Sequence, residues 1–458
     1  MKRTARLFLG ADLALALPTI VFAISSGPPI RRTGAAVDGG VTCTACHRDG
    51  GAANSGPGRL RIVASGYQPG VKQNLRVIVD QPGGQRWGFQ LTARLASAPA
   101  QQAGAFTVNP DTRVRCDSGG PTPATTEAPC NGLVEFASHT SASTRPGTAS
   151  PGIFTVEWTP PAQDMGDIVF YAAGNGSNGS GNPLGDRIYT TSRTIPACTS
   201  NERPALRAAP HAVNAADGRA TVASNTLISI FGSAFAPAAR RLAWGRSDVA
   251  SDAGADRLAP ELGCLAVEIG GQRAPILYVQ NDQINAQAPI LAPSGTAEVV
   301  VITNPGRPNE MRSPAGTVQL GVYSPAFFTF DGRSIAALNL DASGGIVADS
   351  SLYAGAAPAR PGQVVRLFGT GFGYSDPVFQ PGEFPFDSPR IRDPFTLTIG
   401  GIPVAAADIL FFGLSGSAPG LFHLDVRLPA ALPDGDAAVV VRMGGVETQA
   451  GAKIPVRR

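Results

Sequence analysis

The sequence predicts an all-β protein built from three consecutive immunoglobulin-like β-sandwiches. Glycine and proline are frequent, with 55 and 40 among 458 residues, and short runs of Val and Ile recur between them. Many short strands separated by turns produce this balance, whereas long helices do not. The length is large for a single domain and suits three domains of roughly 100–170 residues each.

The first 23 residues have the pattern of a secretory signal peptide, 1–23. Three basic residues precede an apolar stretch that ends at Ala23, and a basic head, an apolar middle and a small-residue exit are typical of exported proteins. Asp12 interrupts the stretch, and a single membrane anchor is the alternative interpretation. Pro18 and the short apolar length favour cleavage. We expect a mature chain without a transmembrane segment, secreted or at the cell surface.

The sequence pattern of residues 27–197 predicts the first of the three sandwiches. Segments 87–93 and 154–158 alternate apolar and polar residues, which is the period-two pattern of a half-buried strand. Loop sequences such as 175–179 separate these segments. The region would hold roughly seven to nine strands, as sandwiches of this size do.

The remainder contains an internal repeat, which predicts two copies of one sandwich at 205–320 and 321–458. Four pairs of segments match in the same order: Ile228–Phe235 with Val365–Phe372, Val267–Pro275 with Leu397–Val404, Ile284–Pro289 with Leu424–Pro429, and Ala297–Ile302 with Ala437–Val441. The first pair shares a Phe-Gly step at Gly232 and Gly369. We expect each strand to leave its sheet there, at a glycine with positive φ.

Four of the six cysteines suit structural disulfides. Cys116 and Cys130 bracket a polar, proline-rich loop, while Cys198 lies in a linker and Cys264 in a strand of the next domain. In an oxidising compartment we expect the pairs Cys116–Cys130 and Cys198–Cys264. Six cysteines allow 15 pairings, so the sequence alone does not prove this connectivity.

The other two cysteines belong to the motif Cys43-Thr-Ala-Cys46-His47. C-x-x-C-H is the attachment signature of c-type haem, in which two thiols take the vinyl groups and the histidine ligates iron. A disulfide or another metal is the alternative, because the glycine-rich surroundings predict no helix to hold a haem. If haem is bound, His139 is the preferred sixth ligand over Met165. The competing interpretation of His139 is a buried ring bonded to a backbone carbonyl.

Other candidate sites are weaker. Asn175, Asn178 and Asp186 offer oxygen ligands to calcium in one loop, although Asn-Gly runs are also ordinary turn sequences. His211 and His423 have no ligands at metal-binding spacing. Motifs of hydrolases, metalloproteases and phosphate-binding loops do not occur. With 37 basic against 34 acidic residues, the chain has no basic stripe for nucleic acid.

Two ordered sets of residues resemble known families. Thr42-Cys43-x-x-Cys46-His47, Tyr67-x-Pro-Gly70, Gly88 to Ala93, His139, Trp158 and Asn175 to Gly179 occur as in the bacterial reeler-like domain, also called choice-of-anchor V, which most of residues 27–195 resembles. Ser324-Pro-Ala-Phe-Phe328, Asp282-Gln-Ile-Asn-Ala-Gln287 and Gly369-Thr-Gly-Phe-Gly373 resemble an uncharacterised C-terminal module of secreted acidobacterial proteins, over residues 209–458. The first resemblance implies an immunoglobulin-like sandwich in surface or secreted proteins, without established enzyme activity.

These observations predict an exported, non-enzymatic binding or scaffolding protein that carries one covalent c-type haem if the motif is used. Its partner would be an extracellular protein or a surface polymer, whose identity the residues do not reveal. The alternative is an extracellular electron-transfer haem protein, which depends on the C-x-x-C-H motif alone. An enzyme has only the location in its favour.

Overall fold

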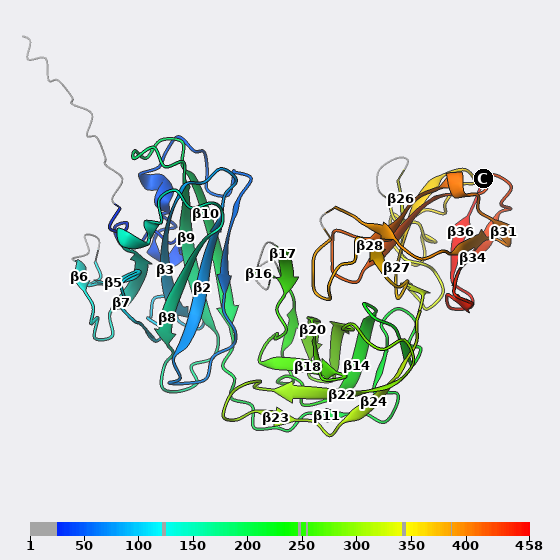
Figure 1. The fold of residues 1–458 in the computed structure, drawn as a ribbon, viewed down its shortest axis with the longest axis horizontal. Helices are drawn as coiled ribbons and strands as arrows, with labels where there is room; N and C mark the ends of the chain where they lie inside the picture. The colour runs from blue at the N-terminus through cyan, green and yellow to red at the C-terminus, as the bar shows by residue number, and fades with distance from the viewer. Residues whose placement is uncertain (1–24, 121–124, 246–248, 253–254, 341–344, 386) are drawn as a thin grey trace, which may run out of the picture.

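The computed structural model describes residues 25–120, 125–245, 249–252, 255–340, 345–385 and 387–458 (Figure 1). The expected signal peptide lies outside these residues. Within them, strands make up nearly all regular structure, and the helical elements are 3-10 turns of three residues. None of the described helices is long and apolar enough to cross a membrane. The predicted all-β class is confirmed.

Two antiparallel sheets enclose the N-terminal core, and we call this region the N-terminal sandwich. The smaller sheet has the strand order β1 (Arg59–Val63), β2 (Gln73–Asp80), β8 (Gly152–Thr159), β4 (Ala105–Phe106). The larger has the order β10 (Arg187–Ile195), β9 (Ile168–Ser177), β3 (Arg86–Leu95), β7 (Val134–His139), β5 (Thr112–Asp117), β6 (Thr125–Glu127). Aromatic side chains dominate the core, including Trp158 against Tyr67 and Phe170.

Strand β3 differs from the half-buried strand that its alternating sequence predicts. Its polar residues Gln90, Thr92 and Arg94 are as buried as the apolar ones between them. The reason is that residues 25–58 cross the outer face of the sheet and cover it. Strand β8, by contrast, alternates between buried and more exposed positions as expected.

The covering segment, residues 25–58, is held by polar contacts to the larger sheet. Gln90 accepts a hydrogen bond from the Arg32 N–H at 2.6 Å and donates one to the Pro29 carbonyl at 2.9 Å. Arg94 donates to both carboxylate oxygens of Asp38, at 2.8 and 2.9 Å. Since Arg94 and Asp38 are both enclosed, this pair fixes the segment that carries the C-x-x-C-H motif.

The middle region also has two sheets. One contains β11 (Ala205–Leu206), β14 (Leu227–Ser233), β21 (Gln283–Gln287), β20 (Ile276–Gln280) and β15 (Arg241–Ala243), with β12 (Ala212–Asn214) on β14. The other contains β13 (Thr221–Val222), β24 (Gly316–Leu320), β22 (Gly295–Thr303), β18 (Leu265–Ile269) and β19 (Gln272–Ala274), with β23 (Met311–Arg312) on β22. A hydrophobic cluster of its own lies between them.

The C-terminal region repeats this arrangement around a third cluster. Its first sheet contains β25 (Ala326–Phe327), β27 (Val364–Thr370), β33 (Phe422–Arg427), β32 (Ile409–Leu414), β29 (Arg390–Ile391) and β28 (Ser375–Asp376), with β26 (Ala337–Asn339) on β27. Its second contains β31 (Ile402–Pro403), β30 (Thr396–Ile399), β34 (Gly435–Met443) and β35 (Val446–Glu447), with β36 (Lys453–Val456) on β34.

The matched segments of the internal repeat pair in the same way in both regions. Strand β14 pairs with β21 as β27 pairs with β33. Strand β18 pairs with β19 and β22 as β30 pairs with β31 and β34. The sheet topology therefore contains the repeat that the four sequence matches predicted, whereas the exact domain limits stay predictions.

The Phe-Gly step has a different cause from the expected one. Neither Gly232 nor Gly369 has a positive φ; the left-handed residues come two positions later, at Ala234 and Gly371. A Cβ atom on Gly232 would lie 2.4 Å from the Phe235 ring. In the second copy a Cβ on Gly369 would lie 2.6 Å from the ring of Phe372. The glycine is needed because a neighbouring backbone carbonyl and an aromatic ring both lie directly against the strand. The carbonyl oxygens, of Ala205 at 2.0 Å and of Ala326 at 2.5 Å, would be the nearest atoms to such a Cβ.

A disulfide and a hairpin join the regions. Both predicted disulfides, Cys116–Cys130 and Cys198–Cys264, are formed. The hairpin of β16 (Val249–Asp252) and β17 (Ala255–Leu258) lies between the N-terminal and C-terminal parts in Figure 1. Its Asp256 accepts a hydrogen bond from Arg61 of β1 at 2.6 Å, with both side chains buried. The Leu258 N–H donates to the Gly382 carbonyl at 2.9 Å on the other side.

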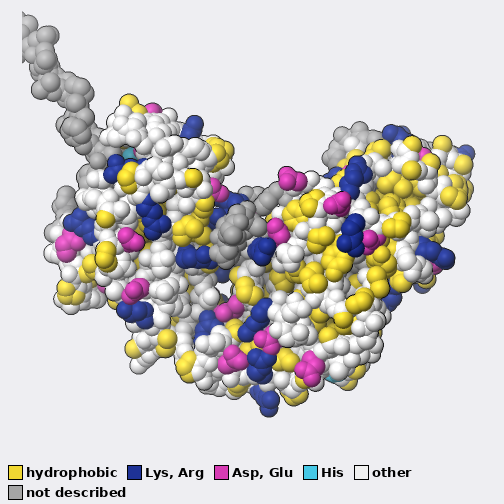
Figure 2. Space-filling model, in the orientation of Figure 1, with side chains coloured by type: hydrophobic (Ala, Val, Ile, Leu, Met, Phe, Trp, Pro, Cys, Tyr) yellow, Lys and Arg dark blue, Asp and Glu magenta, His cyan; other side chains and the backbone are white. Residues whose placement is uncertain are grey.

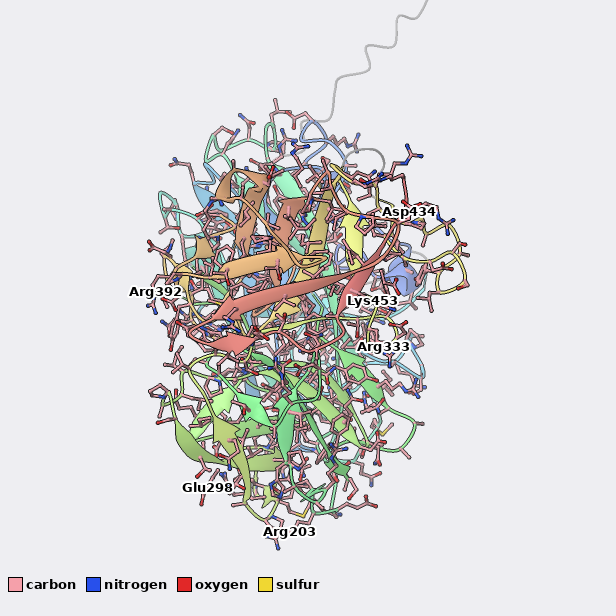
Figure 3. All side chains as sticks on the ribbon, turned by 90° about the vertical axis from the view of Figure 1, so that its right-hand side faces the viewer. Arg203, Glu298, Arg333, Arg392, Asp434 and Lys453 are labelled. Carbon is pink, nitrogen blue, oxygen red and sulfur yellow. A yellow bond between two sulfur atoms is a disulfide. The ribbon has the colours of Figure 1, made fainter. Side chains whose placement is uncertain are left out.

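Charges of both signs are distributed over the surface. Figure 2 shows acidic and basic side chains interspersed on the face in view, with apolar side chains gathered over the middle and C-terminal parts. Figure 3, turned by 90°, places Arg392 and Asp434 near opposite edges of the C-terminal sheets with Lys453 between them, and Arg203 with Glu298 toward the far end of the middle sheets. The faces shown therefore present mixed charge.

A candidate cofactor pocket in the N-terminal sandwich

The C-x-x-C-H motif forms a short helical turn, although its surroundings predicted no helix. Residues Cys43–Ala45 are a 3-10 turn, η2, and Thr42 accepts the Thr44 N–H through its hydroxyl at 3.1 Å. This N-terminal cap satisfies a donor that the turn itself leaves unpaired. The His47 N–H then donates to the Cys43 carbonyl at 3.0 Å. Both thiols and the imidazole are thus held on one compact turn.

Loop contacts seat this turn against the β9–β10 end of the larger sheet. The Gly185 N–H donates to Asp49 at 2.8 Å, and the Asn54 N–H donates to the Ile188 carbonyl at 2.9 Å. Gly50 approaches so closely that a Cβ there would lie 1.8 Å from the Asp186 carbonyl oxygen. A side chain at position 50 would therefore push the motif away from the sheet.

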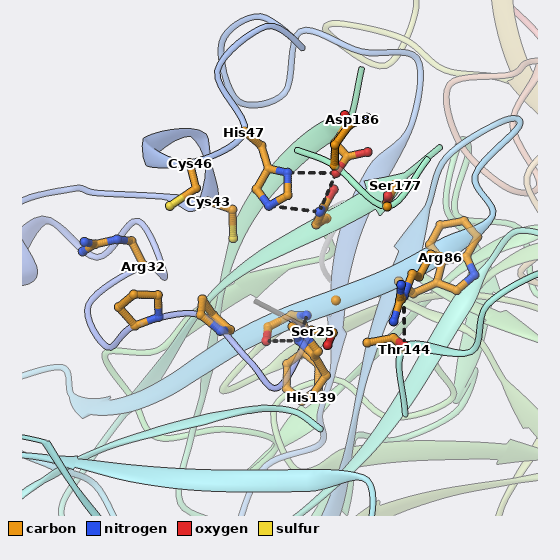
Figure 4. Close-up of a pocket in the computed structure, with 18 residues that line it drawn as sticks. Ser25, Arg32, Cys43, Cys46, His47, Arg86, His139, Thr144, Ser177 and Asp186 are labelled. Carbon is orange, nitrogen blue, oxygen red and sulfur yellow. Dashed lines mark hydrogen bonds and ion pairs between the residues drawn. The ribbon is translucent and has the colours of Figure 1, made fainter. Parts of the chain in front are cut away.

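A pocket of about 380 Å³ lies beside the turn (Figure 4). Its volume is within the range of about 300–1,000 Å³ that is usual for small-molecule and cofactor sites. The four residues predicted to hold haem all line it: Cys43, Cys46, His47 and His139. In the view of Figure 4, His47 and Asp186 lie above Cys43 and His139 lies below it. Trp87, Phe89 and two prolines contribute apolar wall.

His47 contacts two polar groups with its two ring nitrogens. Its Nδ1 lies 2.8 Å from Oδ2 of Asp186, and its Nε2 lies 3.4 Å from the Asn175 side-chain nitrogen. The Nδ1–H is not well aligned with the carboxylate, since Nδ1 has no hydrogen-bond partner of acceptable geometry among the described residues. A carboxylate oxygen can only accept and an amide NH2 can only donate, however, so this pair of neighbours favours the neutral tautomer with the proton on Nδ1. The lone pair of Nε2 is then available on the pocket side.

Asp186 is an almost fully enclosed carboxylate with four donors. Burial by itself raises the pKa of Asp186, but hydrogen bonds from His47, Ser177, Asn175 and the Asn178 N–H outweigh it and leave the pKa below its ordinary value. The same donors occupy both carboxylate oxygens of Asp186, whereas Oδ1 of Asn175 is buried without a hydrogen-bond partner among the described residues. In the loop of Asn175, Asn178 and Asp186, considered for calcium from the sequence, Asn175 and Asp186 contact His47.

His139 reaches the pocket from the end of β7 and bonds a backbone carbonyl, as its competing interpretation expects; its use as an iron ligand stays a prediction. Its Nδ1 lies 3.0 Å from the Phe89 nitrogen and 3.1 Å from the Phe89 oxygen, so the ring bonds backbone as well as facing the cavity. Burial lowers the pKa of His139 to about 4, and the ring is neutral at pH 7. Gly88 lies directly against it, since a Cβ there would be 2.8 Å from the imidazole Cε1.

The two thiols of the motif, Cys43 and Cys46, form no disulfide with each other or with another cysteine. Although Cys43 as a residue is only half-buried, burial of its sulfur, with Cys46 as the second cause, raises the pKa of Cys43 to about 12. Thiol-disulfide oxidoreductases need a lowered pKa at the attacking cysteine. The environment of Cys43 therefore disfavours that use of the motif.

A compact metal site is also disfavoured at the motif. Among the described residues, the only group of three or more Cys, His, Asp or Glu ligand atoms within 4.8 Å of one another is Cys198, Glu261 and Cys264. The two sulfurs of that group are bonded to each other. The ligand atoms of Cys43, Cys46 and His47 therefore do not all lie within 4.8 Å of one another in this structure.

Two arginines add positive charge to the pocket. Within the described part of the chain, neither Arg32 nor Arg86 has a carboxylate partner. The Nε of Arg32 is buried without a hydrogen-bond partner there, and Arg86 donates to the Thr144 hydroxyl at 3.1 Å. Unneutralised guanidinium groups suit a ligand that carries carboxylates.

The structure separates the remaining candidates from this pocket. Met165, the alternative sixth ligand, is 42 % exposed and does not line the cavity. His211 contacts the Thr317 backbone at the surface of the middle region. Asp186 was considered from the sequence only as a calcium ligand and not as part of a haem site, and Arg32 and Arg86 were not singled out, because nothing in their local sequence links them to residues 43–47.

Comparisons with known proteins give structural similarity only. Neither a scan against family models nor a search of curated proteins finds a match. Among solved structures, the chain is similar to the human F-spondin reeler domain, with TM-score 0.21 and 16 % identity over 32 % of this chain and 94 % of that one. It is also similar to the plexin A4 extracellular region, with TM-score 0.21 and 11 % identity over 87 % of this chain and 34 % of that one. A protein with an immunoglobulin-like fold from Nocardia farcinica is similar with TM-score 0.19 and 14 % identity, over 30 % of this chain and 99 % of that one. At these values we take no function from any of them.

Proposed function

We propose that this is an exported, non-enzymatic β protein that carries one covalent c-type haem in the N-terminal pocket and uses its repeated regions to bind an extracellular protein or a surface polymer. The observation that supports the haem is the meeting of Cys43, Cys46 and His47 with His139, which is distant in sequence, around one cavity. Two disulfides support an oxidising compartment.

The pocket residues suit the chemical groups of such a haem. Thioether bonds would form at the Cys43 and Cys46 sulfurs, and His47 would ligate iron. The guanidinium groups of Arg32 and Arg86 would face the carboxylates of the macrocycle. Bound haem supplies one-electron chemistry, and the protein tunes its potential through ligands and burial.

Electron transfer is the second candidate function, and His139 favours it. The neutral imidazole on the pocket wall would supply a sixth ligand if its ring proton lies on Nδ1, where the Phe89 carbonyl can accept it. A filled sixth position would suit electron transfer better than ligand binding. Replacing His139 by Ala should keep covalent haem but convert a low-spin spectrum to a high-spin one. An unchanged low-spin spectrum would exclude His139 as a ligand.

The haem itself is tested by expressing the chain with the cytochrome c maturation system. We expect a Soret band and a haem stain that survives denaturing electrophoresis. Cys43→Ala with Cys46→Ala should abolish the stain, while His211→Ala, which changes a histidine outside the pocket, should retain it. A wild-type protein without stain and Soret band would refute the haem proposal.

A further inference from the structure

The contact between His47 and Asp186 joins two residues that are far apart in sequence. The carboxylate oxygen Oδ2 lies 2.8 Å from Nδ1 of the imidazole, and the Asp186 side chain is only 1 % exposed. Asn175 donates to the same carboxylate at 3.2 Å and lies against the other ring nitrogen. The Asn178 N–H occupies Oδ1 at 3.1 Å. A carboxylate held this firmly leaves His47 one favourable orientation.

We propose that Asp186 is a positioning residue that keeps the proton of His47 on Nδ1, presents Nε2 to the pocket and thereby lowers the reduction potential of the iron that His47 ligates. The part concerning iron depends on the haem proposed above; the part concerning the proton does not. Metal-ligating histidines commonly donate the other ring N–H to a carboxylate, which sets the tautomer and raises the basicity of the ligand. A more basic ligand favours the oxidised iron.

Asn175 has a matching role at the other nitrogen. Without iron, its NH2 group donates toward the Nε2 lone pair at 3.4 Å, a long contact that a stronger ligand can replace. After such a replacement Asn175 keeps its bond to Asp186. The network therefore needs no rearrangement of the carboxylate when Nε2 gains a ligand.

The proton position can be measured in the haem-free protein by two-bond ¹H–¹⁵N correlation spectra. The chain has four histidines, and the His47→Gln variant assigns the His47 signals by their loss. We expect a protonated Nδ1 and an unprotonated Nε2 in the neutral ring. The opposite tautomer in the wild-type protein would overturn the proposal without any Asp186 variant.

Asp186→Asn should reverse the tautomer, because it replaces one acceptor oxygen of a fully occupied carboxylate by a donor. The same change behind a catalytic histidine in serine proteases selects the wrong tautomer while preserving geometry. Asp49→Asn is the matched control, since Asp49 bonds the same loop through the Gly185 N–H and does not contact His47. An Asp186→Asn protein that keeps the proton on Nδ1 would contradict the positioning role.

The haem-loaded protein tests the effect on iron. Loss of such outer partners commonly weakens metal binding by about 10–100-fold; a tenfold preference between the two oxidation states corresponds to about 59 mV for one electron. We expect the midpoint potential of Asp186→Asn to rise by about this amount and that of Asp49→Asn to stay unchanged. If Asp186→Asn reverses the tautomer but leaves the potential unchanged, the effect of Asp186 on the iron is refuted and its positioning role stands. If the wild type binds no haem, the proposed function is refuted and the tautomer result stays valid.

Discussion

The N-terminal and C-terminal regions each bury a histidine, with different results. Burial is the main cause that lowers the pKa of both His139 and His423 to about 4. His423 stacks on Phe411 at 4.5 Å between ring centroids and lies 3.8 Å from Asp425, and its Nδ1 is buried without a hydrogen-bond partner among the described residues. His139 instead faces a cavity with free thiols and unneutralised arginines. A lowered histidine pKa therefore shows only that the ring is buried. The cavity, the free thiols and the arginines without carboxylate partners distinguish the candidate site.

The two regions also differ in their arginine–aspartate pairs. Arg94 and Asp38 are 2 % and 8 % exposed and attach the covering segment to the N-terminal sheet. Arg366 and Asp425 form an equally short pair between neighbouring strands β27 and β33, but the arginine is one-third exposed. The first pair therefore attaches one segment of the chain to a distant sheet. The second pair links two strands that the hydrophobic core already holds together.

Arg94→Met should have the largest effect on stability. It leaves the Asp38 carboxylate buried and unpaired, which costs about 3–5 kcal/mol, and it releases the segment that carries Cys43. Arg366→Met, the comparison variant, should cost less because the one-third-exposed Arg366 is partly screened by solvent, although its partner Asp425 is only 11 % exposed. Denaturant unfolding followed by the fluorescence of Trp87 and Trp158, which both lie in the N-terminal core, measures the effect of Arg94→Met, and circular dichroism of the β structure, which includes the C-terminal sheets, measures that of Arg366→Met. Equal losses of unfolding free energy in the two variants would show that the Arg94–Asp38 pair is no more important to stability than the Arg366–Asp425 pair.

Acid should weaken the N-terminal region of the haem-free protein through His139. The unfolded histidine takes up its proton near pH 6.5, whereas the folded one stays neutral to about pH 4. The unfolded state therefore binds more protons between these values, and the free energy of unfolding falls by about 3 kcal/mol as the pH drops from 6.5 to 4. Comparing wild type with His139→Gln across this range isolates the effect; parallel curves would show that His139 is not the cause.

Gly88→Ala should have a smaller effect that is specific to the pocket. The added Cβ lies 2.8 Å from Cε1 of His139 and must displace the ring, at a cost of about 1–3 kcal/mol. The haem-loaded variant should lose part of its low-spin spectrum while keeping the covalent stain. Gly416→Ala in the C-terminal region is the control, because the nearest atom there is 3.5 Å away. A Gly88→Ala spectrum identical to that of the control would contradict the assigned position of His139.

Local patterns predicted much of this arrangement. The repeated segments predicted equivalent strand pairings, and the loop between Cys116 and Cys130 predicted a disulfide. Both patterns could be recognised because each lies within a short stretch of chain. The motif at residues 43–47 and the resemblance at His139 identified four pocket residues. Attachment of haem to them stays a prediction.

Long-range packing explains what the sequence could not reveal. The alternation of β3 suggests an exposed face, yet Gln90 and Arg94 are covered by a segment that begins more than 30 residues earlier. Asp186 was considered as an oxygen ligand in a turn-like loop. Its partner His47 precedes it by more than 100 residues, so no local pattern pairs the two. Such pairings depend on how loops meet in space, which periodicity does not encode.

The Cys198–Cys264 disulfide also determines how the chain would transmit force. If its two ends were pulled apart, tension would pass from residue 198 to residue 264 through the sulfur bridge. The 65 intervening residues, which include β11 to β17, would be shielded from end-to-end extension by this covalent short cut. Force on them would then arrive only through their lateral hydrogen bonds, such as those of β14 with β21 and of Asp256 with Arg61.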